Sequence, residues 1–277
     1  MESSQVQRGI AAARSIACEL GIQVDDAVLL HNSDRIAVRL IPCDLLVRIA
    51  PQAWADDFQF EAEIAHRLAA TNSPVGTLAS QTKPRVYVHD GFAITFWTYY
   101  APLGEIAPGA YVDALLRIHA GLRQIDLAAP HINVRLAGWA AEVDDPAQTP
   151  DLPDSDRDFL RSTFSCARSA ISKWETKDQL LHGEPHPGNL LNTNQGPIFI
   201  DLQTCQRGPI EYDLAFVPEE AALLYPGANQ ELVHQFRILN WAGFTTMRWR
   251  ATDQFPDQAY WRGEGFNRLR TVLDLDG

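Results

Sequence analysis

The chain has 277 residues, 46% of them hydrophobic and 21% charged, and its 35 acidic and 23 basic side chains give a formal net charge of −12. The hydrophobic fraction excludes a disordered chain, and the length is enough for a sizeable core and for two lobes. A negative surface repels a phosphate backbone. We therefore expect no nucleic-acid partner, and a cationic small molecule is the better match.

The sequence carries no sign of metal-binding cysteines or of a membrane segment. Its cysteines are scattered, with no Cys-x-x-Cys pair to predict a zinc site or a redox motif. Glu2, Arg8, Arg14 and Glu19 interrupt any signal-peptide core near the N-terminus. The most apolar uncharged run, residues 91–104, is too short to span a bilayer. We expect a cytoplasmic protein with no membrane association.

The first hundred residues mix helical and strand patterns. Residues 5–20 and 56–70 have helical spacing, and the second segment opens with two aspartates, which favour a helix N-terminus. Short runs rich in Val, Ile and Leu, separated by turn residues, predict strands. These runs are residues 27–30, 35–40, 45–49, 85–89 and 92–99. The pattern predicts a five-stranded antiparallel sheet with one helix inserted after its third strand.

After Pro102 the chain turns helical. Helical spacing occurs at residues 110–123, 154–174, 219–224, 230–239 and 266–273. Residues 141–154 are rich in Asp and Pro, which predicts a loop. The expected fold class is α+β, with an N-terminal lobe at residues 1–100 and a mainly helical C-terminal lobe at residues 101–277.

Between these helices lies a compact segment rich in His, Gly, Pro, Asn and Asp. Residues 181–191 read LHGEPHPGNLL, and residues 200–202 read IDL. Two apolar runs joined by the turn NTNQG predict a hairpin that places Asn189 and Asp201 at facing strand ends. An amide oxygen and a carboxylate presented together are hard ligands, suited to Mg²⁺ that also holds the phosphates of a nucleotide.

Glu184 lies five residues before Asn189, where its carboxylate is placed to accept a proton from an attacking hydroxyl. A plainer interpretation is a surface hairpin, rich in Gly and Pro, whose polar residues only cap turns. That interpretation fits any one of these residues, but it fits the ordered set poorly. The ordered set therefore favours phosphoryl-transfer chemistry.

The segments HGExHPGNLL, IDL and GPIEYDLA together resemble the catalytic segment of the aminoglycoside phosphotransferase/choline kinase family, which has a protein-kinase-like bilobal fold. The resemblance implies that Asn189 and Asp201 bind Mg²⁺ and that Glu184 occupies the catalytic-base position, where the family has Asp. It also implies that His182 and Asp213 support the catalytic loop. The extra methylene of Glu184 moves the carboxylate by ~1 Å, a displacement that can slow catalysis.

The same resemblance implies a nucleotide site in the N-terminal lobe. Arg48 stands where the fold carries a cation for the α- and β-phosphates, and Glu61 stands where the partner of that cation lies. Arg replaces the usual Lys, and its planar fork can bond both phosphate and carboxylate. No glycine-rich phosphate loop is visible, and the turn that contains Ser33 stands in its place. Trp97 and Tyr99 lie in the segment that resembles the adenine-binding hinge.

The resemblance implies an ATP-dependent or GTP-dependent phosphotransferase that uses Mg²⁺ and phosphorylates a hydroxyl of a small molecule. Three carboxylates after the catalytic loop, Glu211, Glu219 and Glu220, suit an amine-bearing acceptor, such as an aminoglycoside, another antibiotic or a metabolite. A purely solvated acidic surface is an equally open interpretation of these residues. The sequence is compatible with a monomer and with a homodimer.

Two other functions stay open. A nucleotide-binding pseudokinase with a regulatory or binding role is supported by Glu184 in place of Asp and by Arg48 in place of Lys. A protein kinase is disfavoured, because only 11 residues separate Asp201 from Asp213, too few for an activation loop. An active small-molecule kinase is favoured, because the metal pair and the phosphate-binding cation are all present.

Overall fold

The structure is a computed structural model that describes residues 1–33 and 35–274. Its contacts divide the chain into two compact units. The first unit contains residues 1–127 and 188–204, and the second contains residues 128–187 and the chain from residue 205 onward. The predicted lobe boundary at residue 100 falls inside the first unit, and the division into lobes stays a prediction.

The first unit is built on a five-stranded antiparallel sheet with the strand order β1-β2-β3-β5-β4. Its strands are β1 (Val24–Asn32), β2 (Ile36–Pro42), β3 (Leu45–Pro51), β4 (Tyr87–His89) and β5 (Phe92–Thr98). All five expected strands are present, and the predicted fold class, α+β with an N-terminal antiparallel sheet, is confirmed.

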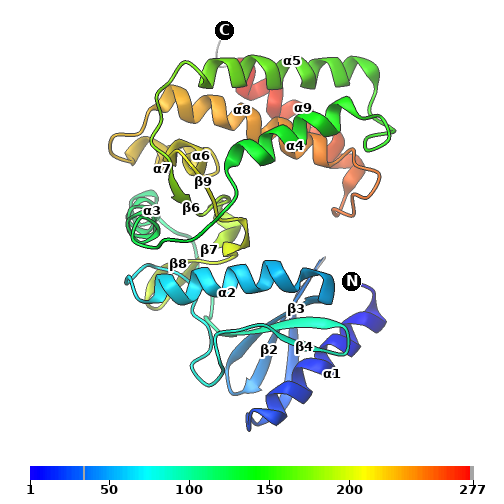
Figure 1. Ribbon diagram of the computed structural model, residues 1–277, viewed down its shortest axis with the longest axis vertical. Coiled ribbons are helices and arrows are strands. Elements are labelled where there is room, and N and C mark those ends of the chain that lie inside the picture. The colour runs from blue at the N-terminus through cyan, green and yellow to red at the C-terminus, as the bar shows by residue number, and fades with distance from the viewer. Residues whose placement is uncertain (34, 275–277) are drawn as a thin grey trace. The chain divides into compact units, whose positions relative to one another are not determined.

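Helices α1 (Ser3–Glu19) and α2 (Ala55–Ala69) cover opposite faces of this sheet (Figure 1). The apolar side of α1 packs on one face in a cluster that includes Val47 of β3. Phe58 of α2 packs on the other face. Because successive strand residues point to opposite faces, Arg48 lies on the face that α2 covers.

A small hairpin from the catalytic segment also belongs to the first unit. The N–H of Gly76 donates to the carbonyl of Phe199 at 2.8 Å, and the N–H of Leu103 donates to the carbonyl of Asn192 at 2.8 Å. Both strands of the hairpin are thus bonded to other segments of this unit. The remaining elements of the unit are η1 (Gln52–Trp54), α3 (Pro108–Leu122), β7 (Leu190–Thr193), β8 (Gly196–Phe199) and η3 (Leu202–Thr204), with η2 (Pro187–Asn189) where the chain enters it.

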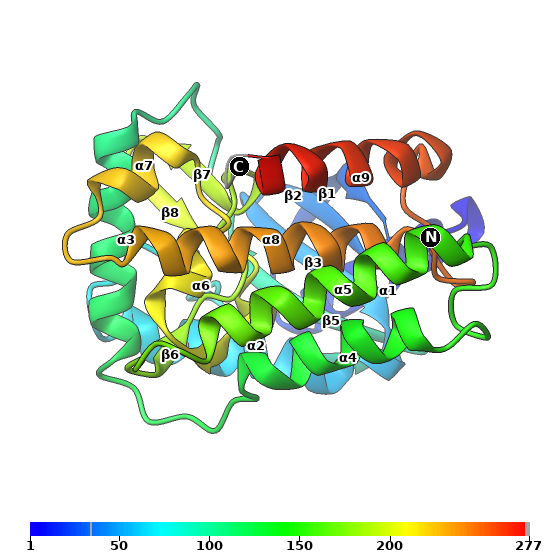
Figure 2. The same cartoon turned by 90° about the horizontal axis from the view of Figure 1, so that it is seen from above.

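The second unit is mainly helical, as predicted. Helices α4, α5, α8 and α9 lie alongside one another around a shared apolar core (Figure 2). Its elements are α4 (Ile132–Asp144), α5 (Asp154–Ile171), β6 (Gln179–Leu181), β9 (Gln206–Gly208), α6 (Ile210–Leu214), α7 (Glu219–Leu224), α8 (Gln230–Met247) and α9 (Gln258–Asp274). Within residues 1–33 and 35–274, no helix is long and apolar enough to cross a membrane.

The helical part departs from the sequence prediction in several places. Helix α6 was not predicted, and α9 begins at Gln258, eight residues before the predicted start. Helix α4 was not predicted, and it extends into the expected loop at residues 141–154 as far as Asp144. Helix α8 continues beyond residue 239 because tertiary packing overrides the low helix propensity of Gly243. A Cβ atom at Gly243 would lie 2.3 Å from the ring of Trp139, so only glycine lets α8 approach α4 this closely.

Candidate active site

The catalytic hairpin brings the two predicted metal ligands to one end of its strands. Asn189 immediately precedes β7, Asp201 follows β8, and the N–H of Ile200 donates to the carbonyl of Asn189 at 3.0 Å. Asp201 has a positive φ of 64°, a conformation that is uncommon for a residue with a side chain. Such backbone conformations concentrate at functional sites.

Arg48 connects this hairpin to α2. Its Nη2 donates to Oδ1 of Asp201 at 2.9 Å, and its Nη1 is ion-paired with Oε1 of Glu61. The N–H of Leu202 donates to the same Glu61 oxygen at 3.2 Å. The structure therefore places three residues predicted from distant parts of the sequence, Arg48, Glu61 and Asp201, in one charged line within the first unit.

Burial sets the electrostatics of this line. The Glu61 side chain is only 1% exposed, and its burial raises the pKa of the carboxyl, while Arg48 acts in the opposite direction. Burial lowers the pKa of Arg48, but the charges of Glu61 and Asp201 more than offset this effect, so its pKa lies above the usual value. Within the described part of the chain, Oε2 of Glu61 has no hydrogen-bond partner. Removing either partner of an ion pair buried this deeply would leave an uncompensated charge and would destabilise the fold.

A second arginine at this site was missed in the sequence. Nη1 of Arg35 lies 3.4 Å from Oδ1 of Asp201, and the Arg35 guanidinium lies 5.7 Å from the ring centre of Trp54. Its side chain is 18% exposed. Arg35 comes directly before β2, in the turn region that takes the place of a glycine-rich loop. This position was the signal that could have identified Arg35, because the resemblance implies that the turn lies at the phosphates and a guanidinium binds phosphate oxygens well.

The residues at the hairpin end fit a magnesium ion that is shared with a nucleotide. Mg²⁺ is usually bound through one or two carboxylates together with substrate phosphates and water, and Asn189 and Asp201 supply an amide oxygen and a carboxylate. Among the residues that the structure describes, no group of three or more His, Cys, Asp or Glu side chains is placed to hold a metal ion. An ion that depends on phosphates needs no such group.

The other predicted nucleotide-binding residues, Ser33, Trp97 and Tyr99, do not belong to the charged line that Arg48 forms with Glu61 and Asp201. The hydroxyl of Ser33 donates to the carbonyl of Arg35 at 3.3 Å, which closes the turn between β1 and β2. Trp97 pairs with Leu46 on one side and with Leu78 on the other, so its backbone lies inside the sheet. Tyr99 lies just beyond β5, where the Arg39 guanidinium is 4.2 Å from its ring centre.

In the second unit, the side chain of Glu184 is paired with an arginine from α4. Nη1 of Arg135 donates to Oε1 of Glu184 at 2.7 Å, and the two side chains are 22% and 31% exposed. The N–H of His186 donates to the carbonyl of Glu184 at 2.8 Å. Arg135 was missed because its helix was not predicted.

Asp213 holds the backbone of the catalytic loop from inside the second unit. Its Oδ2 accepts from the N–H of His182 at 2.9 Å, and its Oδ1 accepts from the N–H of Gly183 at 2.8 Å. Asp213 and His182 are both fully buried. Nδ1 of His182 in turn accepts from the N–H of Glu184 at 3.4 Å. This geometry is that of a structural brace.

The three carboxylates considered for the acceptor lie on α6 and α7. Oε1 of Glu211 accepts from the N–H of Asn229, at the start of α8, at 3.2 Å. Glu219 and Glu220 are exposed in the first turn of α7. Burial lowers the pKa of Arg237, and these two carboxylates act in the opposite direction. Glu211 thus has an internal partner, while Glu219 and Glu220 face solvent.

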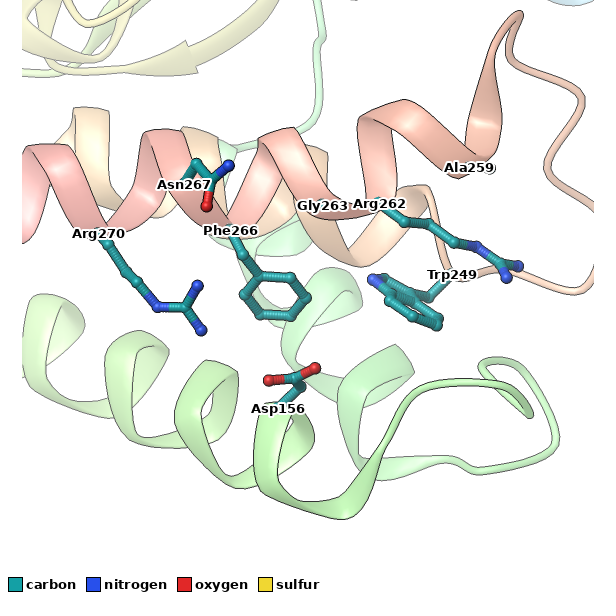
Figure 3. Close-up of a pocket in the computed structure, with 8 residues that line it drawn as sticks. All are labelled: Asp156, Trp249, Ala259, Arg262, Gly263, Phe266, Asn267 and Arg270. Carbon is teal, nitrogen blue, oxygen red and sulfur yellow. The ribbon is translucent and has the colours of Figure 1, made fainter.

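A hollow of about 490 Å³ opens between α5 and α9 of the second unit (Figure 3). Phe266 and Trp249 form its aromatic part, Arg270 lies beside Phe266, and Asp156 points up from α5 (Figure 3). None of the residues that line it is among the predicted site residues. The predicted chemistry therefore involves other residues than those that line this hollow.

Comparison with known proteins identifies the family of the chain. The profile of the Phosphotransferase enzyme family, APH, matches residues 24–251. The GDP complex of wild-type aminoglycoside 2′-phosphotransferase-IIIa has a TM-score of 0.71 at 15% identity, over 97% of this chain and 99% of that chain. Amicoumacin kinase hAmiN, in complex with AMP-PNP, Ca²⁺ and Ami, has a TM-score of 0.70 at 10% identity, over 99% and 96%.

A choline/ethanolamine kinase family protein from Mesorhizobium loti has a TM-score of 0.62 at 16% identity, over 95% of this chain and 94% of that chain. No curated protein matches the chain. The family profile runs from the first residue of β1 to just beyond α8 and so includes the whole catalytic segment. The chain therefore belongs to the phosphotransferase enzyme family, as its catalytic segment predicted.

Proposed function

We propose that the chain transfers the γ-phosphoryl group of ATP or GTP, with Mg²⁺, to a hydroxyl of an amine-bearing small molecule. The observation that carries this proposal is the line of charges formed by Glu61, Arg48 and Asp201, with Asn189 at the same end of the hairpin. Phosphoryl transfer depends mainly on positioning the reactants and on stabilising negative charge. Arg48 supplies a positive charge for the phosphates, and Asn189 and Asp201 supply oxygen ligands for a metal ion that positions them.

Arg48 and Arg35 hold the phosphates in this proposal. Both guanidiniums lie at Oδ1 of Asp201, at 2.9 and 3.4 Å, and a guanidinium can bond phosphate oxygens through the same N–H groups. Glu61 fixes the direction of Arg48 from α2. Asn189 and Asp201 would hold Mg²⁺, which when bound would neutralise charge on the phosphates of the nucleotide.

Glu184 orients the acceptor hydroxyl and accepts its proton. Its backbone is fixed through His182 and Gly183, which Asp213 holds by two hydrogen bonds. General-base catalysis needs a carboxylate within hydrogen-bond reach of the proton it takes. The loop that Asp213 braces supplies a fixed backbone position for that residue.

The acceptor class is proposed from charge and from the relatives. Glu219 and Glu220 present two exposed carboxylates, which suit an ammonium group. The proteins of similar fold include one solved with GDP and kanamycin, one solved with ADP and spectinomycin, and an ethanolamine kinase from Plasmodium vivax. Kanamycin, spectinomycin and ethanolamine each carry both a hydroxyl and an amino group. These three compounds start the acceptor screen.

The screen incubates the protein with Mg-ATP or Mg-GTP and each compound, and measures nucleoside diphosphate release and the mass of the product. Turnover that depends on one hydroxylated amine is the expected result. The absence of turnover with any acceptor, together with nucleotide binding, would favour the pseudokinase. That alternative has one structural observation in its support, because Glu184 is paired with Arg135.

Glu184 is tested by two substitutions. Glu184→Gln keeps the shape of the side chain but cannot accept the proton, so kcat should fall by about 10²–10⁴ with nucleotide affinity unchanged. Glu184→Asp shortens the side chain and draws the carboxylate away from Arg135, so kcat should also fall. An Asp variant much faster than the unmodified protein would contradict the assignment of Glu184 as a working base.

The metal is tested by calorimetry of nucleotide binding with Mg²⁺ and with chelator. Binding should be tighter with Mg²⁺, because Asn189 and Asp201 contact the nucleotide through the ion. Equal affinity in both conditions would count against this metal pair.

A further inference from the structure

The Glu184 side chain is held by a helix that lies far from it in the sequence. Arg135 is separated from Glu184 by 49 positions, yet its Nη1 donates to Oε1 at 2.7 Å. This is the length of a charge-assisted hydrogen bond. Both side chains are more than two-thirds buried, so solvent screens the pair less than it screens a surface pair.

Arg135 is itself fixed in place. It lies in the first turns of α4, and its guanidinium is 5.9 Å from the ring centre of Trp139, one turn further along the helix. Trp139 is 6% exposed and belongs to the core of the second unit. Burial disfavours the charge on Arg135, but Tyr212 and Glu184 offset this effect and leave its pKa above the usual value. The cation beside Glu184 is therefore permanent.

The length of the Glu184 side chain explains why an ion pair with Arg135 would matter for catalysis. Glutamate has one more rotatable bond than aspartate, and fixing each additional rotor costs conformational entropy. Misplacing a reacting group by 1 Å can cost about a hundredfold in rate. Asp213 fixes only the backbone next to Glu184, through His182 and Gly183, and it leaves the side chain to another group.

We propose that Arg135 is a positioning residue that holds the Glu184 carboxylate in its working orientation. Arg135 and Glu184 then form a matched pair, in which the arginine restores the precision that the longer side chain loses. In this role Arg135 acts through Glu184. This role rests on the proposed function, in which Glu184 is the base.

A double-mutant cycle tests the role. Arg135→Met, Glu184→Gln and the double variant are compared with the unmodified protein, using Mg-ATP and the acceptor that gives turnover in the screen. Arg135→Met should lower kcat about 10-fold to 100-fold, with the KM for Mg-ATP unchanged. In the Glu184→Gln background the same substitution should change kcat less than about threefold, because the group it positions is already disabled. Arg135→Lys should recover part of the lost rate.

Arg250→Gln is the matched control. Arg250 donates from Nε and Nη2 to the carboxylate of Glu142 on the same helix α4, at 2.8 and 2.7 Å. Its removal should leave kcat unchanged, and melting temperatures of all variants monitor folding. If Arg135→Met lowers kcat equally in both backgrounds, or leaves it unchanged, Arg135 does not position Glu184 and the proposed function still stands. If the unmodified protein turns over no acceptor, the proposed function fails and this role fails with it.

Discussion

Arg48 bonds Asp201 and Glu61 at the same time, one through each terminal nitrogen of its guanidinium. Glu61 comes from α2, Arg48 from β3 and Asp201 from the catalytic hairpin, so one side chain links three elements of the first unit. A lysine at this position would carry its three N–H donors on one nitrogen, whereas the planar guanidinium offers a separate nitrogen to each carboxylate. The departure from lysine thus gives the site an internal brace.

The buried part of this brace predicts a strong dependence of stability on Arg48. Arg48→Met leaves Glu61, 1% exposed, without its cation, and should lower the free energy of unfolding by about 3 kcal/mol. Arg48→Met combined with Glu61→Gln should recover part of that loss, because no buried charge is left unpaired. Urea unfolding of the two variants measures the difference. Equal losses would show that the pair is not coupled.

Arg35 should contribute to nucleotide affinity independently of Arg48. Arg35→Gln removes the guanidinium at 3.4 Å from Asp201 and should weaken binding of Mg-ATP about tenfold, or ~1.4 kcal/mol. Arg67→Gln is the control, because Arg67 lies in the same unit and pairs with Glu63 on α2. Calorimetry of both variants tests this role. A similar loss in the control would mean that only the overall charge matters.

Two aspartates of the catalytic segment should respond differently to substitution. Asp213→Ala leaves the buried N–H groups of His182 and Gly183 without an acceptor and should cost about 2–4 kcal/mol of stability together with activity. Asp201→Asn should abolish turnover with a much smaller change in stability, because its side chain is 26% exposed. Thermal melting and kcat of both variants make the comparison. Equal shifts in melting temperature would contradict the division into brace and metal ligand.

Deprotonation of Tyr212 should cause part of the loss of stability at alkaline pH. Burial raises the pKa of its hydroxyl from 10.0 to about 12, with Arg135 acting in the opposite direction. In the unfolded chain the group deprotonates near its usual pKa, while the folded chain keeps the proton until about pH 12. Its contribution is therefore complete below pH 10 and is lost as the pH rises towards 12, at roughly 1.4 kcal/mol per pH unit.

Tyr212→Phe tests that contribution, because the ring keeps its edge contacts with Phe216 and Phe236 at 5.4 and 5.5 Å. The variant should lose less stability than the unmodified protein over this pH range in urea unfolding. Parallel pH profiles would place the alkaline sensitivity elsewhere.

The sequence predicts local structure well where periodicity carries the information. Strands β1 to β5, helix α2 and the catalytic hairpin follow from alternating patterns and from turn residues. The same kind of signal existed for α4, since Ile132, Leu136, Trp139 and Val143 are spaced three or four residues apart and are all buried. Its C-terminal end was obscured by the Asp and Pro residues that follow.

The contacts of the site are harder to predict. Arg35 lies 166 positions from Asp201, and Arg135 lies 49 positions from Glu184. Neither pairing leaves a local pattern, because each depends on how separate elements pack. Arg48 and Glu61 could be named in advance only because the catalytic segment resembles a known family.

The chain passes from one compact unit to the other three times, after residues 127, 187 and 204. Residues 1–127 alone therefore lack the hairpin that carries Asn189 and Asp201, and no single cut yields either unit whole. A single crossover in the coding sequence therefore cannot replace the first unit by that of a relative while leaving the second unit intact.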